Sequence, residues 1–151
     1  MRELFDTADF LGRARRKMRS GAYSREPLML LRVGWKGDSV ECDWLMRPID
    51  PWDRDLPAHL ARENQTLQAL QDALNLREIV FRSFPAVLNA DLRMYRANED
   101  RRLELVMRGC MCRSNEVLYR VPSVAMRAKL CGFHFTLADS GHKSLVPISL
   151  S

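Results

Sequence analysis

Residues 28–47 can be folded on paper into a β-hairpin with almost no freedom of register. The turn falls at Gly37 and Asp38, because glycine readily adopts the positive φ that a two-residue loop needs. Closing the loop there pairs eight apolar side chains across the strands, and the two-residue period of a strand puts all eight on one face. The predicted pairs are Trp35 with Val40, Val33 with Cys42, Leu31 with Trp44 and Met29 with Met46. On the other face, Arg32 opposite Asp43 forms a favourable charge pair.

The rest of the chain predicts helices and further strands. In chain order we expect a helix at about 3–19, a helix at about 55–75, a second hairpin at about 91–110, a C-terminal helix or strand at about 116–137 and a loose tail at 139–151. Residues 76–84 fit either a continued helix or a strand, and Asn75 as a helix end favours the strand. Short connections favour antiparallel neighbours, and each helix needs one apolar face covered. The chain is therefore predicted to be a single α+β domain, with a mostly antiparallel, curved sheet built from hairpins and packed against two or three α-helices.

Two details of these elements bear on the surface of the protein. The first helix is predicted to bury a stripe made of Leu4, Ala8, Leu11 and Met18. The second hairpin, turning at 98–101, pairs Met94 with Leu105 and Leu92 with Met107. The flaw in that register is that Arg96 then lies opposite Leu103.

Composition and charge narrow the class of protein. The chain is 46% hydrophobic and 28% charged, as in ordinary globular proteins. Its longest unbroken apolar run, Leu28 to Leu31, is far too short to span a membrane. The first residues are acidic and lack the apolar region of a secretory signal, so we expect a cytoplasmic protein with reduced cysteines.

The first helix ends in a run of cations that is a candidate anion site. Its members are Arg13, Arg15, Arg16, Lys17 and Arg19, in a chain of formal net charge +5. They can bind phosphates, but acidic residues at the start of the helix and basic ones at its end also match the helix dipole. Because no aromatic residue interleaves the cations, the pattern favours a solvated helix end over nucleic-acid binding.

Asp50, Asp53 and His59 are the candidate acid–base residues. Two carboxylates and an imidazole this close together can serve an enzyme with a small pocket. Asp and Pro also commonly build helix-entry turns, and this second interpretation is the more economical one.

No metal or cofactor is predicted. Cys110, Cys112, Cys131 and His134 provide four soft ligands, but their spacing differs from that of zinc fingers and ribbons. The sequence also lacks the glycine-rich loops that hold phosphates and the serine elbow of hydrolases.

The best functional hypothesis is a non-enzymatic domain that binds a protein partner or an apolar small ligand, with a homodimer as one form. The predicted surface is the apolar hairpin face, represented by Trp35, Trp44, Met29 and Met46, which forms an interface if no helix covers it. The alternatives are the small pocket enzyme at 50–59 and an anion or nucleic-acid binder at the basic helix.

Overall fold

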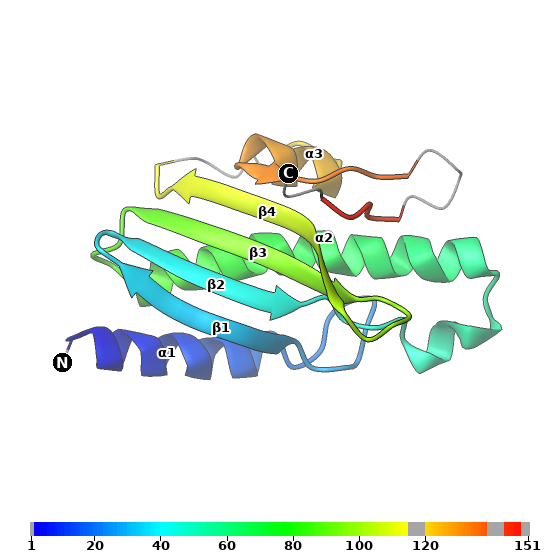
Figure 1. The fold of residues 1–151 in the computed structure, drawn as a ribbon, viewed down its shortest axis with the longest axis horizontal. Helices are drawn as coiled ribbons and strands as arrows, with labels where there is room; N and C mark the ends of the chain where they lie inside the picture. The colour runs from blue at the N-terminus through cyan, green and yellow to red at the C-terminus, as the bar shows by residue number, and fades with distance from the viewer. Residues whose placement is uncertain (1, 115–119, 139–143, 149–151) are drawn as a thin grey trace.

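The computed structural model of this protein describes residues 2–114, 120–138 and 144–148. Within them, three α-helices pack against an open five-stranded sheet, so the predicted α+β class is confirmed (Figure 1). The helices are α1 (Arg2–Lys17), α2 (Ala58–Ser83) and α3 (Val124–Leu130), and a short 3₁₀ helix, η1 (Pro51–Asp55), precedes α2. The strands are β1 (Met29–Lys36), β2 (Ser39–Leu45), β3 (Asn89–Ala97), β4 (Leu103–Cys112) and β5 (Phe133–His134).

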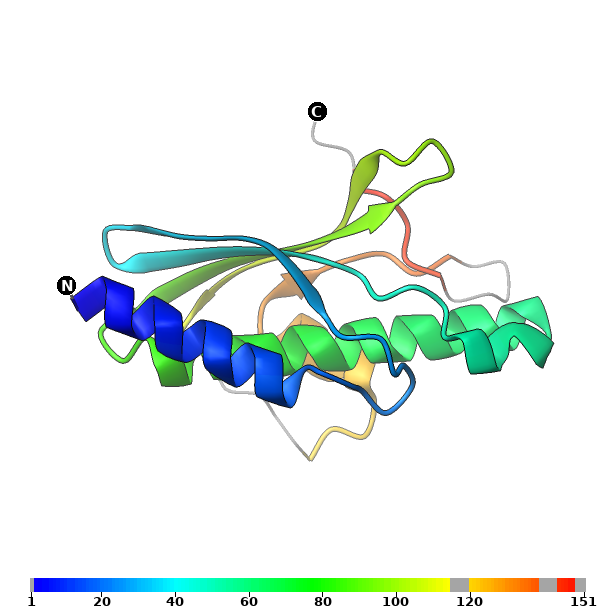
Figure 2. The same cartoon turned by 90° about the horizontal axis from the view of Figure 1, so that it is seen from below.

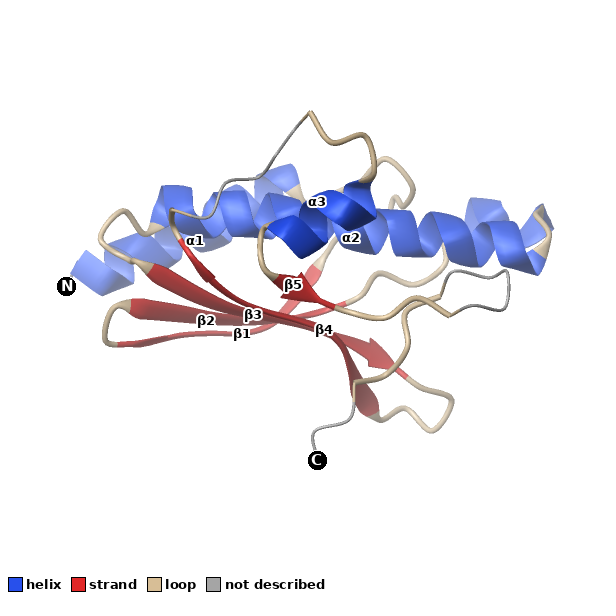
Figure 3. Cartoon of the chain, turned by 90° about the horizontal axis from the view of Figure 1, so that it is seen from above, coloured by secondary structure: helices blue, strands red, loops and turns tan. Residues whose placement is uncertain are grey.

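The strands lie side by side in the order β1-β2-β3-β4-β5. Every neighbouring pair is antiparallel except β2 and β3, because α2 carries the chain back across the sheet between them. Figures 2 and 3 show all three α-helices on the same face of the sheet. The two hairpins therefore share one sheet, which has a covered face and an open face.

The first hairpin confirms the predicted turn and half of the predicted register. Gly37 has a φ of 60°, and the strands pair Trp35 with Val40, Val33 with Cys42 and Arg32 with Asp43. A β-bulge at Leu31 then shifts the register, so that Leu30 lies opposite Trp44 and Met29 opposite Leu45. The predicted pairs of Leu31 with Trp44 and of Met29 with Met46 are wrong, because the bulge adds one residue to β1 and reverses the faces on which the preceding residues lie: Leu30 packs against the core, whereas Met29 and Leu31 are exposed.

The second hairpin differs from the prediction in the same way. Met94 lies opposite Met107, and after a bulge Tyr95 lies opposite Leu105. The predicted register was therefore wrong by one to two residues. The observed register places Arg96 opposite Glu104, and the two side chains form an ion pair at 2.9 Å.

Helix α2 is longer than predicted at its C-terminal end and begins later. Residues 76–83 continue the helix, so the predicted strand at 76–84 is wrong, and the exposed Asn75 does not end the helix. Leu76, Ile79 and Val80 are buried, because the sheet and the other helices surround this half of α2. Asp55 lies in η1 and does not cap α2, which begins after Pro57.

Helix α1 presents a different face to the core from the one predicted. Phe10 and Ala14 on the helix and Met18 directly after it are buried, spaced as a single helical stripe. Of the predicted stripe only Met18 is buried, whereas Leu4 and Leu11 are 66% and 42% exposed. The tertiary packing of α1 against α2 selects one of two competing apolar stripes.

The C-terminal part is more ordered than predicted where the structure describes it. Ser123 caps α3, since its Oγ accepts a hydrogen bond from Met126 N at 3.2 Å, and β5 ends at His134. Leu145 is buried and Ile148 N donates to Leu105 O at 2.7 Å, so residues 144–148 are not a loose tail. The predictions for 116–119 and for the remainder of the tail lie outside the described residues.

Candidate functional site

The helices cover most of the apolar hairpin face that the sequence singled out. Trp44 and Met46 lie in the hydrophobic core, with exposures of 0% and 5%. Met29 and Trp35, both on β1, are 58% and 39% exposed. The binding role predicted for these four residues stays a prediction, and only Met29 and Trp35 present substantial accessible surface.

The open face of the sheet is polar and neutralises its own charges. Three arginines and three carboxylates of β1–β4 lie close together there, and they are Arg32, Glu41, Asp43, Asp91, Arg93 and Arg108. Arg93, for example, lies 2.9 Å from Asp43, and Arg108 lies 3.8 Å from Asp91. Each of these three arginines thus has a carboxylate partner on the same face.

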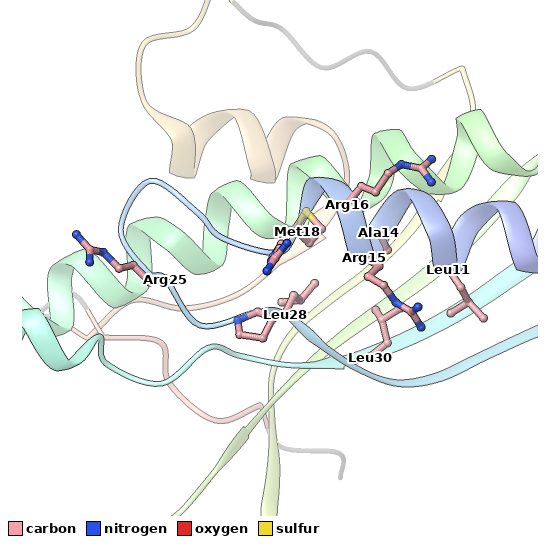
Figure 4. Close-up of a pocket in the computed structure, with 10 residues that line it drawn as sticks. Leu11, Ala14, Arg15, Arg16, Met18, Arg25, Leu28 and Leu30 are labelled. Carbon is pink, nitrogen blue, oxygen red and sulfur yellow. The ribbon is translucent and has the colours of Figure 1, made fainter.

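A hollow lies instead between α1 and β1, the strand at the edge of the sheet. We call it the α1–β1 groove; it has a volume of about 960 Å³ (Figure 4). Its lining residues are Leu11, Ala14, Arg15, Arg16, Met18, Arg19, Arg25, Pro27, Leu28 and Leu30. Six of these ten are apolar and the other four are arginines, so the groove combines an apolar floor with cationic sides.

The groove exists because α1 packs mainly against α2 and leaves the β1 side of α1 uncovered. Phe10 is fully buried and its ring lies 5.6 Å from that of Phe84, just after α2. This packing leaves Leu11 and Arg15 directed toward the β1 side, as Figure 4 shows. Leu4 and Phe5, about two turns before Leu11 in α1, are also more than half exposed.

The loop that joins α1 to β1 closes one end of the groove and is firmly attached. Leu28 N donates to Met18 O at 3.0 Å, and Tyr23 N donates to the side chain of Gln68 on α2. Gly21 packs so close to Gln68 that a Cβ atom on residue 21 would lie 2.1 Å from Gln68 Nε2. A side chain at position 21 would therefore displace the amide group of Gln68.

The buried ion pair of Arg47 with Asp72 holds the same loop in place. Arg47 donates to both carboxylate oxygens of Asp72, at 2.8 and 2.9 Å, and to the main-chain oxygen of Glu26 at 2.8 Å. Gln68 donates to Asp72 at 2.9 Å, so the network joins the segment after β2, helix α2 and the loop. Burial raises the pKa of Asp72, while the charge of Arg47 opposes that rise.

Three of the five predicted anion-binding residues line the groove, and the other two lie outside it. Arg13 pairs with Asp9 at 2.9 Å, and Lys17 is exposed away from the groove lining. Arg15, Arg16 and Arg19 line the groove, and in the part of the chain that the structure describes none of them forms an ion pair. Figure 4 shows Arg15 extending toward Leu30, whereas Arg16 points away from it.

Arg25 was not among the predicted residues. It lies at the end of the groove, where its guanidinium stacks on the ring of Trp52 at 4.5 Å. Its cation is thus positioned by an exposed aromatic residue of η1.

The predicted acid–base residues do not form one cluster. Asp50 is buried and accepts hydrogen bonds from the main-chain N–H groups of Arg25 at 2.7 Å and Trp52 at 2.9 Å, which lower its pKa. Asp50 and Asp53 both line a small depression in the surface, and Asp53 accepts a hydrogen bond from Asn64 at 3.4 Å. His59 is exposed on the first turn of α2 and does not line that depression. The structure gives Asp50 a capping role, and catalysis by these residues stays a prediction.

The four soft ligands are also separated. Cys110 and Cys112 are exposed on β4, whereas Cys131 is buried and donates to Ala128 O. Cys42 is buried as predicted, and burial raises the pKa of its thiol to about 12. All four cysteines of the chain are free thiols.

Comparison with protein-family models, curated proteins and solved structures finds no match to this chain. Within the described residues, no helix combines the length and apolar character that crossing a bilayer requires.

Sequence reasoning found the arginines of α1 but missed the apolar half of the groove. Leu28 and Leu30 belong to the longest apolar run of the chain. Such a run places apolar side chains on both faces of a strand, and this is a signal that some of them lie outside the core. Leu11 was assigned to the buried stripe, and only the rotation of α1 shows that it is accessible.

Proposed function

We propose that this protein is a non-enzymatic binding module that holds a segment of a partner protein in the α1–β1 groove. The observation that carries the proposal is the combination of an apolar floor with three arginines, Arg15, Arg16 and Arg19, that form no ion pair with any described residue. Such a surface complements a polypeptide segment that carries apolar and acidic side chains.

The contrast with the open sheet face supports this assignment. On that face each arginine has a carboxylate partner in the protein itself, so it offers little to an acidic partner. In the groove the cations flank exposed apolar side chains, including Leu11 at 42% exposure. Burying these apolar groups supplies affinity, and the arginines select for charge and speed up association.

Photo-crosslinking tests the proposal. A photoreactive amino acid replaces Leu11 in the groove, and in a control protein it replaces Leu130, a leucine on α3 that is 50% exposed. We expect a polypeptide adduct in cells of the source organism at position 11 and none at position 130. The captured polypeptide is then purified and titrated against the wild type.

Charge reversal provides the second half of the test. The double variant Arg15→Glu, Arg19→Glu is expected to weaken binding of the purified partner by about tenfold or more, because two attractive charges become repulsive. Arg62→Glu on the exposed surface of α2 is the matched control. Equal affinity for all three proteins would contradict the proposal, as would a small-molecule adduct in native mass spectrometry that occupies the groove instead.

A further inference from the structure

The edge of the sheet beside the groove suggests how the partner segment is held, an inference that rests on the function proposed above. β1 is the first strand of the sheet and has β2 on one side only. At the opposite edge, β5 pairs with β4, and Ile148 N donates to Leu105 O. Among the described residues, no strand covers the outer side of β1.

The turn of the first hairpin determines which main-chain groups face outward. Gly37, the first loop residue, has a positive φ, while Asp38 does not, as in a type II′ turn. In such a two-residue hairpin the flanking pair, Lys36 and Ser39, exchanges both hydrogen bonds, and hydrogen-bonded pairs then alternate. Gly34 and Arg32 therefore bond to β2, and the N–H and C=O groups of Val33 and Trp35 point to the open edge.

The bulge at Leu31 limits the length of this edge. Pairing with β2 is regular from Arg32 to Lys36 and shifts before Arg32. A strand added outside β1 can follow these five residues in regular register, and its chain can then continue beside Leu28 and Leu30, which line the groove. Side chains on its inner face would contact the exposed apolar stripe of α1, where Leu11 lies.

We propose that the partner segment binds as an additional β-strand on β1, pairing with the main chain of Val33 and Trp35. Its inward side chains are apolar and enter the α1–β1 groove, and its acidic side chains lie near Arg15 and Arg19. Charge complementarity favours this occupant, because Arg15, Arg16 and Arg19 line the groove and form no ion pair within the described residues. Main-chain pairing provides affinity, and the groove provides selectivity.

Synthetic peptides of about eight residues, the length of β1, test this geometry. The probes alternate Leu or Val with Asp or Glu, and binding to the ¹⁵N-labelled protein is followed by calorimetry and by amide hydrogen exchange. We expect the amides of Val33 and Trp35 to exchange rapidly in the free protein and at least tenfold more slowly with peptide bound. The amides of Gly34 and Arg32, which already bond to β2, change little.

N-methylated peptides provide the matched control. Methylating two alternate peptide nitrogens that face β1 removes two hydrogen bonds, and we expect binding to weaken by about tenfold or more. Methylating the alternate nitrogens on the other side, which face solvent, leaves affinity within about twofold.

The outcomes separate the two proposals. A peptide that binds in the groove without protecting Val33 and Trp35, and without sensitivity to methylation, overturns the added strand and leaves the binding function intact. If no acidic peptide binds, and if the captured partner binds the double variant Arg15→Glu, Arg19→Glu as tightly as the wild type, both the binding function and the added strand are overturned. Slow exchange of Val33 and Trp35 in the free protein together with a doubled mass in native mass spectrometry would assign the edge to a second copy, and this too overturns the added strand.

Discussion

Replacing Asp72 with Asn removes the charge that neutralises Arg47 inside the protein while preserving the size of the side chain. Both side chains of this pair are only 2% exposed. Arg47 makes two hydrogen bonds to Asp72 and one to the main-chain oxygen of Glu26. The change therefore leaves a buried cation without its counter-ion beneath the loop that closes the α1–β1 groove.

The expected loss of stability is about 3–5 kcal/mol, the usual cost of removing one partner of a buried ion pair. A useful control lies on the same helix. Glu78 and Arg82 are 3.3 Å apart, but their side chains are 48% and 50% exposed. Glu78→Gln is expected to cost about 0.5 kcal/mol or less, because solvent screens an exposed pair.

Urea denaturation followed by circular dichroism measures both effects. With a slope of about 2 kcal/mol per molar urea, Asp72→Asn moves the midpoint down by about 1.5–2.5 M and Glu78→Gln moves it by about 0.3 M or less. A double variant, Arg47→Met with Asp72→Leu, removes both charges and is expected to lose less stability than Asp72→Asn alone. A loss below about 1 kcal/mol for Asp72→Asn, or a double variant that is less stable than the single one, would refute the reasoning.

Two further predictions concern titration and thiol access. The lowered pKa of Asp50 stabilises the fold above the usual aspartate pKa near 4, and that stability is lost as the pH falls through the lower folded value. Denaturation midpoints between about pH 2 and 6 are therefore expected to fall more steeply for the wild type than for Asp50→Asn, and identical slopes would contradict the role of Asp50. In thiol labelling of the native protein, exposed Cys110 and Cys112 react while buried Cys42 and Cys131 react only in denaturant. Mass spectrometry of the labelled protein counts the modified residues, and early labelling of Cys42 would be inconsistent with its burial.

The candidate site could be predicted only in part. The basic run of α1 is visible in the sequence, and Arg15, Arg16 and Arg19 do line the groove. The apolar floor was not predicted, because Leu28 and Leu30 carry the same alternation as a core strand. The position of Arg25 at the end of the groove depends on stacking with Trp52, which lies in a different element.

The sequence by itself determined the features that depend on neighbouring residues. Glycine at position 37 and the flanking alternation define the first hairpin turn, and the charge pair of Arg32 with Asp43 follows from that turn. Ser123 likewise caps α3, because an N-cap bond joins residues three positions apart. The α+β class follows from the same local signals added along the chain.

Only the tertiary structure decided which faces of these elements are buried. Helix α1 carries two apolar stripes, and the fit of Phe10 against Phe84 selects the one that packs, leaving Leu11 in the groove. The bulge at Leu31 is invisible in the alternation, and the length of α2 is supported by the elements around Leu76 and Ile79 rather than by its own propensity. Burial depends on how distant surfaces fit together in space, and a pattern of neighbouring residues does not contain that information.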